Sequence, residues 1–399
     1  MSKKLDIRQE IIKCLCRSGQ MTRTDFVRQT GIRPATVFEV VDELKQDGII
    51  SELERKGKKT GRVSPAITFN MDYLWLLGID FQFKKTLGVI TDLNGKVIAS
   101  AEGPGGSRKG LEDCLHEIKT VVTALKNQVG VDWKIVAGAG FSDPGVVDIE
   151  HGISLRAVNL QGWENFNSGT WLREMTGLRH CLVLPETIVG TYMEYYSRFP
   201  EPPDSLFHMK TGTGIGGGFV KDGALFIGGS NRGMEIGHVV IMPEGPLCKC
   251  GNRGCLEAIA GEAGLKRRVA ELINNGVDTA LKTENFSITK FCELAGRDKA
   301  ARMLAYDVSS KISNALATVV TLLNPSMIVL SGELAGLCNI LTDTIKRELP
   351  LRCMPGAADK LAIEISTLDE YATARGAALM LREKILLEQS DKKFILGSA

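Results

Sequence analysis

The sequence contains no apolar run near the roughly 18 to 20 residues that are needed to cross a bilayer. It also lacks the apolar core of a signal peptide, because Met1-Ser2-Lys3-Lys4 leads directly into an amphipathic helical pattern. Without an export signal, its 10 cysteines do not indicate a disulfide framework. We therefore expect a cytoplasmic protein without membrane partners, in which clustered cysteines indicate a metal site.

A large net charge is also missing, since 49 Lys and Arg residues face 47 Asp and Glu residues. The charge is unevenly placed, however. Residues 1–70 carry 14 basic and 9 acidic side chains, a net charge of +5 that leaves −3 for the remainder. A basic terminal segment favours a polyanionic partner such as nucleic acid, and 399 residues predict two or three domains.

The first 50 residues have the periodicity of three short helices. We expect the first to end at Gly19 and the second to begin at the capping box Thr22-Arg23-Thr24-Asp25 and end at Gly31. The third begins at Pro34. Its apolar positions recur at helical spacing: Val37, Val40, Val41 and Leu44.

Two short strands, at residues 49–53 and 63–69, are predicted to flank a basic loop. Three helices followed by a basic hairpin predict a winged helix-turn-helix that binds double-stranded DNA. The candidate DNA contacts lie at the start of the third helix and in the loop: Arg33, Thr36, Arg55, Lys56, Lys58, Lys59 and Arg62. The alternative is a small three-helix module that contacts another protein.

Beyond residue 70, short apolar strands alternate with amphipathic helices, which is an α/β pattern. Predicted strands cover residues 74–80, 86–91, 97–101, 135–140 and 327–330. Predicted helices cover residues 111–129, 300–323 and 372–387. The sequence shows no convincing internal repeat.

One histidine and three cysteines crowd into residues 238–255. Thiolates and imidazole suit zinc, and the four residues His238, Cys248, Cys250 and Cys255 would fill a closed tetrahedral shell. Such a shell leaves no position for a catalytic water, so we predict a structural Zn²⁺. The alternative is a set of buried free cysteines beside an unrelated histidine.

This zinc segment, together with four further motifs, resembles the ROK family of repressors and sugar kinases. The motifs occur in the family's order: Gly138–Gly145, Asn159–Trp163, Thr211–Gly218, and Asn324-Pro325 before a strand that ends in Ser331-Gly332. The N-terminal helices, with Gly61-Arg62 and Asn70, are similar to the family's repressor branch, which includes xylose and N-acetylglucosamine repressors. The family's kinases lack these helices.

The resemblance implies an actin-like, two-lobed sugar-kinase fold behind the winged helix. The expected domains are residues 1–70, a first lobe at 71–185 completed by a C-terminal helix at 370–390, and a second lobe with the zinc site at 186–369. It also implies a homodimer or homotetramer.

Two kinase motifs of the family are altered in this chain. The loop that should read Asp-x-Gly-Gly-Thr has Gln82 and Phe83 after Asp80, and Phe83 is expected to intrude where bare backbone meets phosphate. The catalytic base position has Pro185-Glu186 instead of Asn-Asp. We therefore expect no kinase activity, with Glu186 a degenerate base.

The sugar-contacting positions are better kept, since the resemblance assigns this role to Asn159, Glu186, Glu235, His238 and Glu257. Glu257 is alternatively a carboxylate that favours a helix start. The glycine-rich residues 211–218 would bind nucleotide phosphate or form a packing turn.

We thus predict a sugar-responsive or sugar-phosphate-responsive DNA-binding regulator, with repressor the expected sign. The alternatives are an ATP-dependent sugar kinase with a DNA-binding head, a regulator that binds other proteins, and a domain whose pocket binds nothing.

Overall fold

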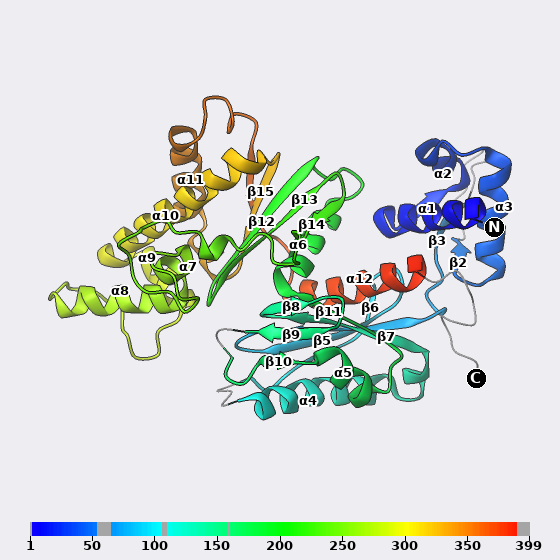
Figure 1. Ribbon diagram of the computed structural model, residues 1–399, viewed down its shortest axis with the longest axis horizontal. Helices are drawn as coiled ribbons and strands as arrows, with labels where there is room; N and C mark the ends of the chain where they lie inside the picture. The colour runs from blue at the N-terminus through cyan, green and yellow to red at the C-terminus, as the bar shows by residue number, and fades with distance from the viewer. Residues whose placement is uncertain (1, 54–64, 106–109, 158–159, 389–399) are drawn as a thin grey trace. The chain divides into compact units, whose positions relative to one another are not determined.

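The computed structural model describes residues 2–53, 65–105, 110–157 and 160–388 of the chain (Figure 1). The chain divides into two compact units: residues 1–189 with 370–399, and residues 190–369. Among the described residues, no helix is long and apolar enough to span a membrane.

The first unit begins with a module of three helices and a small antiparallel sheet (Figure 1). The helices are α1 (Ser2–Ser18), α2 (Arg23–Thr30) and α3 (Pro34–Gln46). The strands are β1 (Gln20–Thr22), β2 (Ile50–Glu52) and β3 (Ala66–Phe69), in the order β1-β3-β2. The three predicted helices are confirmed, and the first flanking strand is shorter than predicted. The second flanking strand is found from Ala66 to Phe69, and residues 63 and 64 of that prediction lie outside the described residues.

Local sequence explains where these helices begin and end. The capping box is formed, because the Asp25 amide donates to Thr22 Oγ1 (3.2 Å) and the Thr22 amide donates to Asp25 Oδ2 (3.0 Å). Gly31 ends α2 with a φ of 66°, which favours glycine. Pro34 opens α3, and the predicted apolar stripe of α3 is buried.

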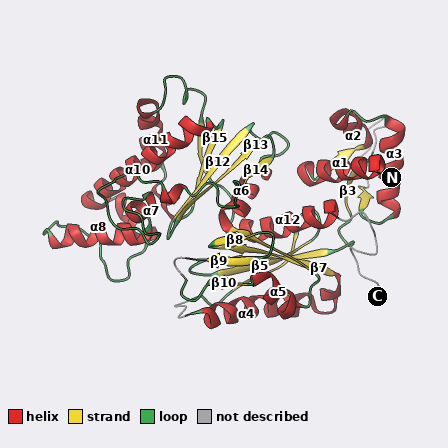
Figure 2. Cartoon of the chain, in the orientation of Figure 1, coloured by secondary structure: helices red, strands yellow, loops and turns green. Residues whose placement is uncertain are grey.

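The first lobe follows in the same unit as a five-stranded sheet, shown as yellow arrows in Figure 2. Its order is β11-β7-β4-β5-β6, with bounds β4 (Trp75–Phe81), β5 (Thr86–Thr91), β6 (Val97–Glu102), β7 (Val136–Asp143) and β11 (His180–Pro185). A small antiparallel sheet contains β8 (Val146–Asp148), β9 (Ile153–Arg156) and β10 (Glu164–Phe166). The helical elements are α4 (Leu111–Val129), η1 (Gly130–Ile135), α5 (Ser168–Thr176) and α12 (Ala372–Glu388).

Helix α12 crosses the sheet at unusually short range, because two strands carry glycine beneath it. A Cβ at Gly78 would lie 2.0 Å from the Ala374 carbonyl oxygen, and one at Gly140 would lie 2.1 Å from that of Ala377. Any larger residue at either position would push the helix away from the sheet.

The same helix joins the lobe to the N-terminal module. Arg382 is 4% exposed and donates to the carbonyl oxygens of Leu93 (2.9 Å) and Cys16 (3.3 Å). Its guanidinium also lies 5.4 Å from the centre of the Phe69 ring. Buried side chains of α1, α3 and α12 share one hydrophobic cluster, so the module is packed on the first lobe.

The second unit contains another five-stranded sheet. Its order is β14-β13-β12-β15-β16, with bounds β12 (Ser205–Thr211), β13 (Ile215–Lys221), β14 (Ala224–Phe226), β15 (Met327–Ser331) and β16 (Ala362–Ile365). Its other elements are η2 (Ile236–His238), α7 (Leu256–Ala260), α8 (Glu262–Asn274), α9 (Ile288–Ala295), α10 (Lys299–Leu323), η3 (Glu333–Leu337) and α11 (Asn339–Arg352). Helix α6 (Glu186–Tyr196) begins in the first unit and continues into the second.

The two five-stranded sheets have the same topology. In each, the first strand pairs antiparallel with the second and parallel with a later strand: β4 with β5 and β7, and β12 with β13 and β15. The chain therefore contains a structural repeat that its sequence does not show. The strands and helices predicted beyond residue 70 are confirmed, with ends shifted by at most a few residues.

Candidate ligand site and metal centre

The turn after β4 is closed by its own side chains. Asp80 is fully buried and accepts hydrogen bonds from Ser142 Oγ (2.9 Å) and from Gln82 Nε2 (2.5 Å). The backbone N–H of Gln82 donates to the carbonyl oxygen of Lys85 (2.9 Å), and this hydrogen bond closes the turn. The carboxylate that begins this turn thus accepts hydrogen bonds from two donors of the same lobe.

Phe83 packs on the core of its own lobe. Its side chain is half-buried there. Gln82, and not Phe83, is the residue of this turn that contacts Asp80. The physical reason is that an aromatic ring gains more from burial against the core than from an open turn.

The altered base position lies at the junction of β11 and α6. Pro185 ends β11, where it pairs with Asp143 of β7, and Glu186 is the first residue of α6. A carboxylate in the first turn of a helix is stabilised by the helix dipole, and Glu186 therefore has a structural role available to it.

Sequence reasoning missed Asp143, a fully buried carboxyl group next to Glu186. It accepts hydrogen bonds from the Gly145 amide (2.8 Å), from Trp163 Nε1 (2.9 Å) and from the hydroxyl group of Ser154. Burial raises the pKa of Asp143, the three hydrogen bonds lower it, and the nearby Glu186 raises it. An acidic residue at the end of an otherwise apolar strand was the available signal.

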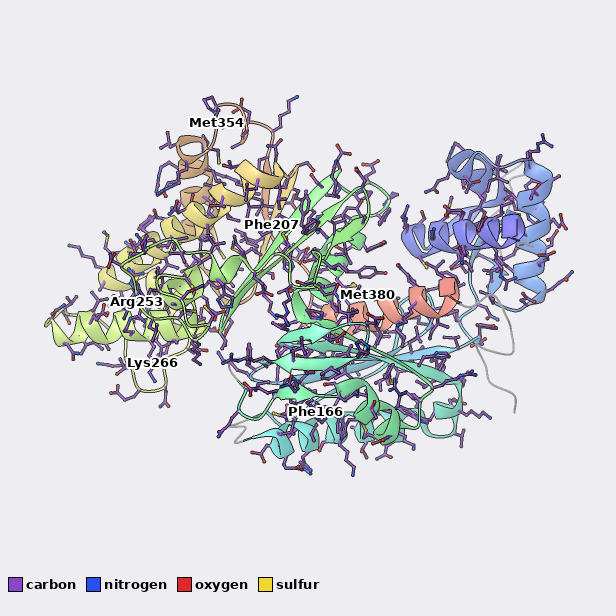
Figure 3. The ribbon with its side chains drawn as sticks, in the orientation of Figure 1. Phe166, Phe207, Arg253, Lys266, Met354 and Met380 are labelled. Carbon is purple, nitrogen blue, oxygen red and sulfur yellow. The ribbon has the colours of Figure 1, made fainter. Side chains whose placement is uncertain are left out.

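The predicted metal ligands come together in the second unit. One donor atom from each of His238, Cys248, Cys250 and Cys255 lies within 4.8 Å of all the others. Backbone bridges pair residue 240 with 255 and residue 247 with Arg253, which Figure 3 labels in this loop. These bridges fold the segment back on itself and gather ligands that are up to 17 positions apart in sequence.

The geometry of this cluster fits a tetrahedral ion. His238 Nδ1 lies 3.7 Å from Cys248 Sγ, and the Sγ atoms of Cys250 and Cys255 are also 3.7 Å apart. With zinc–sulfur bonds of about 2.3 Å, a tetrahedron has sulfur–sulfur edges of about 3.8 Å. Free thiols would not need this spacing, so the four residues can hold a metal with little rearrangement.

Two of the candidate sugar contacts border the cluster. Burial raises the pKa of Glu235, while His238 lowers it and Glu257 raises it, which places the three side chains within electrostatic reach. Glu257 Oε2 accepts a hydrogen bond from the Ile215 amide (2.8 Å). Glu257 therefore ties α7 to the glycine-rich segment, as well as lying in the first turn of that helix.

Close packing accounts for several glycines of residues 211–218 and their neighbours. A Cβ at Gly218 would lie 2.0 Å from Thr191 Oγ1, and one at Gly237 would lie 2.0 Å from the Ile215 carbonyl oxygen. A Cβ at Gly217 would lie 2.8 Å from the ring of Phe207. The alternative interpretation of this segment, a packing turn, thus has a physical basis in the structure.

The remaining site predictions are distributed as follows. Arg33 is exposed at the start of α3 and Thr36 is half-buried on its first turn. Six of the other predicted residues lie outside the described residues: Arg55, Lys56, Lys58, Lys59, Arg62 and Asn159.

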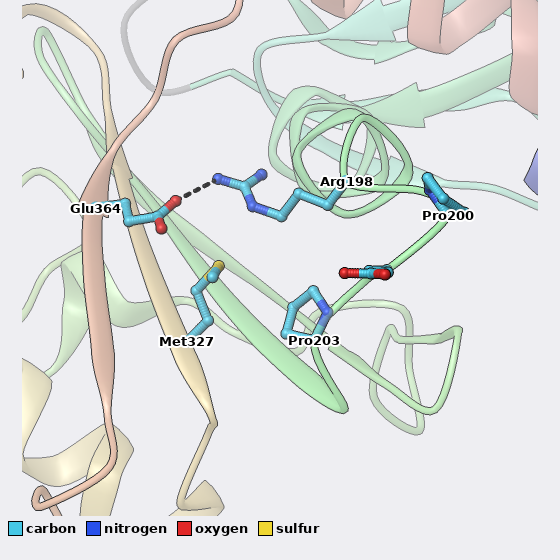
Figure 4. A pocket seen from close by; sticks show the side chains of 6 residues that line it. Arg198, Pro200, Pro203, Met327 and Glu364 are labelled. Atoms are coloured by element: carbon cyan, nitrogen blue, oxygen red, sulfur yellow. Dashed lines mark hydrogen bonds and ion pairs between the residues drawn. The ribbon is translucent and has the colours of Figure 1, made fainter.

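A hollow in the second unit lies apart from these residues (Figure 4). It is lined by Arg198, Pro200, Glu201, Pro203, Met327 and Glu364. Its one basic side chain is engaged, since Arg198 pairs with Glu364 (3.2 Å) and Glu194 (3.0 Å). The charge that could attract an anionic ligand here is already neutralised.

A model of the ROK family matches residues 76–384. The N-acetylglucosamine repressor of Escherichia coli O157:H7 is 24% identical over 94% of this chain and 92% of its own length. The xylose repressor of Caldicellulosiruptor bescii is 24% identical over 94% of this chain and 95% of its own length. The glucokinase of Thermotoga maritima is 27% identical, over 79% of this chain and 99% of its own length.

Among solved structures, a ROK family transcriptional regulator homologous to the E. coli MLC protein covers 97% of this chain and 99% of its own. Its TM-score is 0.81 at 24% identity. A ROK family glucokinase from Streptomyces griseus, solved with glucose and AMPPNP, covers 77% of this chain and 98% of its own, with a TM-score of 0.66 at 22% identity. These two likenesses support the two-lobed sugar-kinase fold.

Proposed function

The chain belongs to the ROK family, and we propose that it is a DNA-binding transcriptional regulator that responds to a sugar or a sugar phosphate. The observation that carries this proposal is the N-terminal module of three helices and a three-stranded sheet. The two repressors match a share of the chain large enough to include most of residues 1–70. The glucokinase match leaves about a fifth of the chain uncovered.

We interpret the module as a winged helix. Helix α3 would enter the major groove with its N-terminal end, where Arg33 and Thr36 lie, and the basic residues 55–62 would neutralise phosphates. Because counterion release dominates such binding, duplex affinity should fall steeply with salt.

Kinase activity is lost in this proposal. Gln82 bonds Asp80, and residues 82–85 contain no glycine that would let the backbone of the turn approach a phosphate. Glu186 replaces a shorter base and is one methylene longer, and a misplacement of about 1 Å costs on the order of 100-fold in rate. The repressor relatives support this, although the glucokinase shows that the family includes kinases.

The sugar would be held by Asn159, Glu186, Glu235, His238 and Glu257, through carboxylates and imidazole that pair with vicinal hydroxyl groups. The metal cluster would carry Zn²⁺, bound by His238 Nδ1 and the three thiolates. Zinc would supply structural rigidity and no chemistry. His238 Nε2 then remains available to the ligand side, so the metal fixes the tautomer and orientation of a sugar contact.

Regulation would follow from a population shift. Sugar binding would favour one arrangement of the two lobes, and a homodimer or homotetramer would convert that change into a new spacing of its DNA-binding modules. The first lobe and the module share one hydrophobic cluster, so they are expected to move together. A monomer in gel filtration at working concentration would count against this scheme.

Thermal unfolding of the zinc-replete protein against a panel of sugars, amino sugars and their phosphates tests the sensor role. A ligand at 100 times its dissociation constant should raise the free energy of unfolding by about 2.7 kcal/mol. No shift with any compound would contradict sugar sensing. Sugar-dependent ADP production that Glu186→Gln abolishes would instead support a kinase.

A further inference from the structure

Helix α3 places an aromatic ring on the surface that would meet DNA. Phe38 is 40% exposed, whereas the apolar stripe of the same helix is buried. Exposed Ala35 lies three positions earlier, on the same face of the first turn, and exposed Arg33 precedes the helix. A recognition helix contacts base edges with these N-terminal turns.

The Phe38 ring is held in place from one side. Arg23, the first residue of α2, lies over it with its guanidinium 5.6 Å from the ring centre and donates to the Phe38 carbonyl oxygen (3.3 Å). The same guanidinium is anchored by Asp42 (2.6 Å) and Glu52 (3.2 Å). A ring fixed in this way loses little conformational entropy when its exposed side meets a partner.

Arg23 also neutralises a negative charge on this surface. The outward face of α3 carries Asp42, which would repel DNA phosphates, and Arg23 neutralises it directly. Hydrogen bonding to Arg23 lowers the pKa of Asp42, so that carboxylate stays ionised and keeps the arginine in place. Arg23 thus offsets the charge of Asp42, while exposed Glu39 follows the ring in sequence. The apolar pair Ala35 and Phe38 remains exposed beside Arg33.

We propose that Phe38, supported by Ala35, contacts the 5-methyl group of thymine in the major groove of the operator. Phenylalanine and alanine contribute to base recognition in this way, because the thymine methyl is the apolar group that the major groove presents. The inference rests on the proposed DNA-binding function, and it adds a base and a residue to that function. Arg33 would contribute phosphate or guanine contacts that do not depend on the methyl group.

The test begins with selection of preferred duplexes from a random pool by the full-length protein. Deoxyuridine then replaces each thymine of the selected site in turn, which removes only the methyl group. We expect about a fourfold loss of affinity at one or two positions per half-site, the factor that burial of one methyl group gives. Phe38→Ala should reduce the thymine-to-uracil affinity ratio at those positions to about one.

Three variants separate the possible causes. Phe38→Leu keeps an apolar side chain and should keep part of the ratio. Arg33→Ala should weaken thymine and uracil duplexes equally and lower the salt slope by about one. Met303→Ala, which changes an exposed apolar residue of α10, should change nothing. Thermal unfolding checks that each variant is folded, and the uracil scan of the unchanged protein does not depend on any variant.

The outcomes are distinct. If no duplex is preferred, the proposed DNA-binding function fails and this inference fails with it. If a site is selected but uracil is tolerated at every position, or if Phe38→Ala keeps the full ratio, only the role of Phe38 is overturned.

Discussion

Both lobes contain the same β-hairpin, but the turn of the hairpin has a different composition in each lobe. Between β4 and β5 the turn has no glycine, and Gln82 folds back on the buried Asp80. Between β12 and β13 the turn is Gly212-Thr213-Gly214, and the Ile215 amide after it bonds Glu257. One turn is closed by a side chain, while the other leads into Gly217 and Gly218, where a Cβ would meet closely packed neighbours. The glycines in the second turn therefore give only weak support for nucleotide binding. The absence of glycine from the first turn argues more strongly against it.

The middle of each first strand shows a second exchange. The fourth residue of β4 is Gly78, which lets the backbone of α12 approach, whereas the fourth residue of β12 is His208. In the second lobe the glycine is on the helix instead, because Gly190 of α6 faces the His208 ring. The repeat thus preserves close helix–sheet contact while its residues change, which explains why the sequence does not reveal it.

Metal removal should have the largest effect, and it should be confined at first to the second lobe. Structural zinc contributes on the order of 10 kcal/mol of apparent folding free energy. We expect chelation, or Cys255→Ser, to increase hydrogen exchange from residue 238 to 257 and at Ile215, which Glu257 holds. Cys338→Ser, an exposed cysteine of the same unit, is the control. Unchanged exchange after verified metal loss would contradict a structural role.

The close packing of η2 on the strand after the second turn can be tested by adding one methyl group. Gly237→Ala would place a Cβ 2.0 Å from the Ile215 carbonyl oxygen and should lower the free energy of unfolding by about 3 kcal/mol. Gly229→Ala, at a position with no atom within 4 Å, should change it by less than about 0.5 kcal/mol. Equal values in urea unfolding would show that the glycines serve something other than packing.

Closure of the first turn makes a smaller prediction. Gln82→Ala removes a hydrogen bond to a buried carboxylate and should cost about 2 kcal/mol in urea unfolding. Lys119→Ala, at an exposed position of α4 in the same lobe, should be nearly neutral. A neutral Gln82→Ala would mean that the Gln82–Asp80 contact does not hold the turn closed.

The smallest effect concerns the buried histidine of the second lobe. Burial lowers the pKa of His208 to about 3, and its ring nitrogens lie 3.1 Å from Thr191 Oγ1 and 2.7 Å from Ser331 Oγ. As the pH falls, His208 therefore binds a proton in the unfolded chain before it does so in the folded protein. Stability should fall as the pH drops below about 6.5, by up to about 1.4 kcal/mol per pH unit.

Comparison of variants isolates this slope from that of the acidic residues. His208→Gln should flatten the dependence between pH 6.5 and 5, whereas exposed His116→Gln should leave it unchanged. Parallel curves for all three proteins would place the titrating group elsewhere.

Local patterns predicted most elements of this fold. The Thr22–Asp25 box, Gly31 and Pro34 mark helix ends through backbone chemistry that acts within a few residues, and each was found where expected. The cysteine–histidine spacing predicted the metal cluster for the same reason. These signals need no knowledge of the tertiary structure.

Contacts between distant segments were not predictable. Arg382 reaches Cys16 across 366 positions, and Trp163 reaches Asp143 through a loop whose course no local pattern specifies. Sequence alone also does not say which way a turn side chain such as Phe83 points, whereas the structure packs Phe83 on the core of the first lobe. The sequence therefore predicted which residues could form the site. The hydrogen bonds that other segments of the chain make to such residues could be identified only in the structure.

We propose that sugar binding regulates DNA binding in this protein and that the protein does not transfer phosphate. Fluorescence anisotropy of a selected operator duplex, with and without the sugar that raises the unfolding temperature, tests it directly. We predict a change in duplex affinity of about 5-fold to 150-fold, which corresponds to the usual coupling free energy of about 1–3 kcal/mol. We also predict that no ADP forms when ATP is added. Duplex affinity that is unchanged at saturating sugar, or ADP formed at a rate dependent on that sugar, would contradict the account.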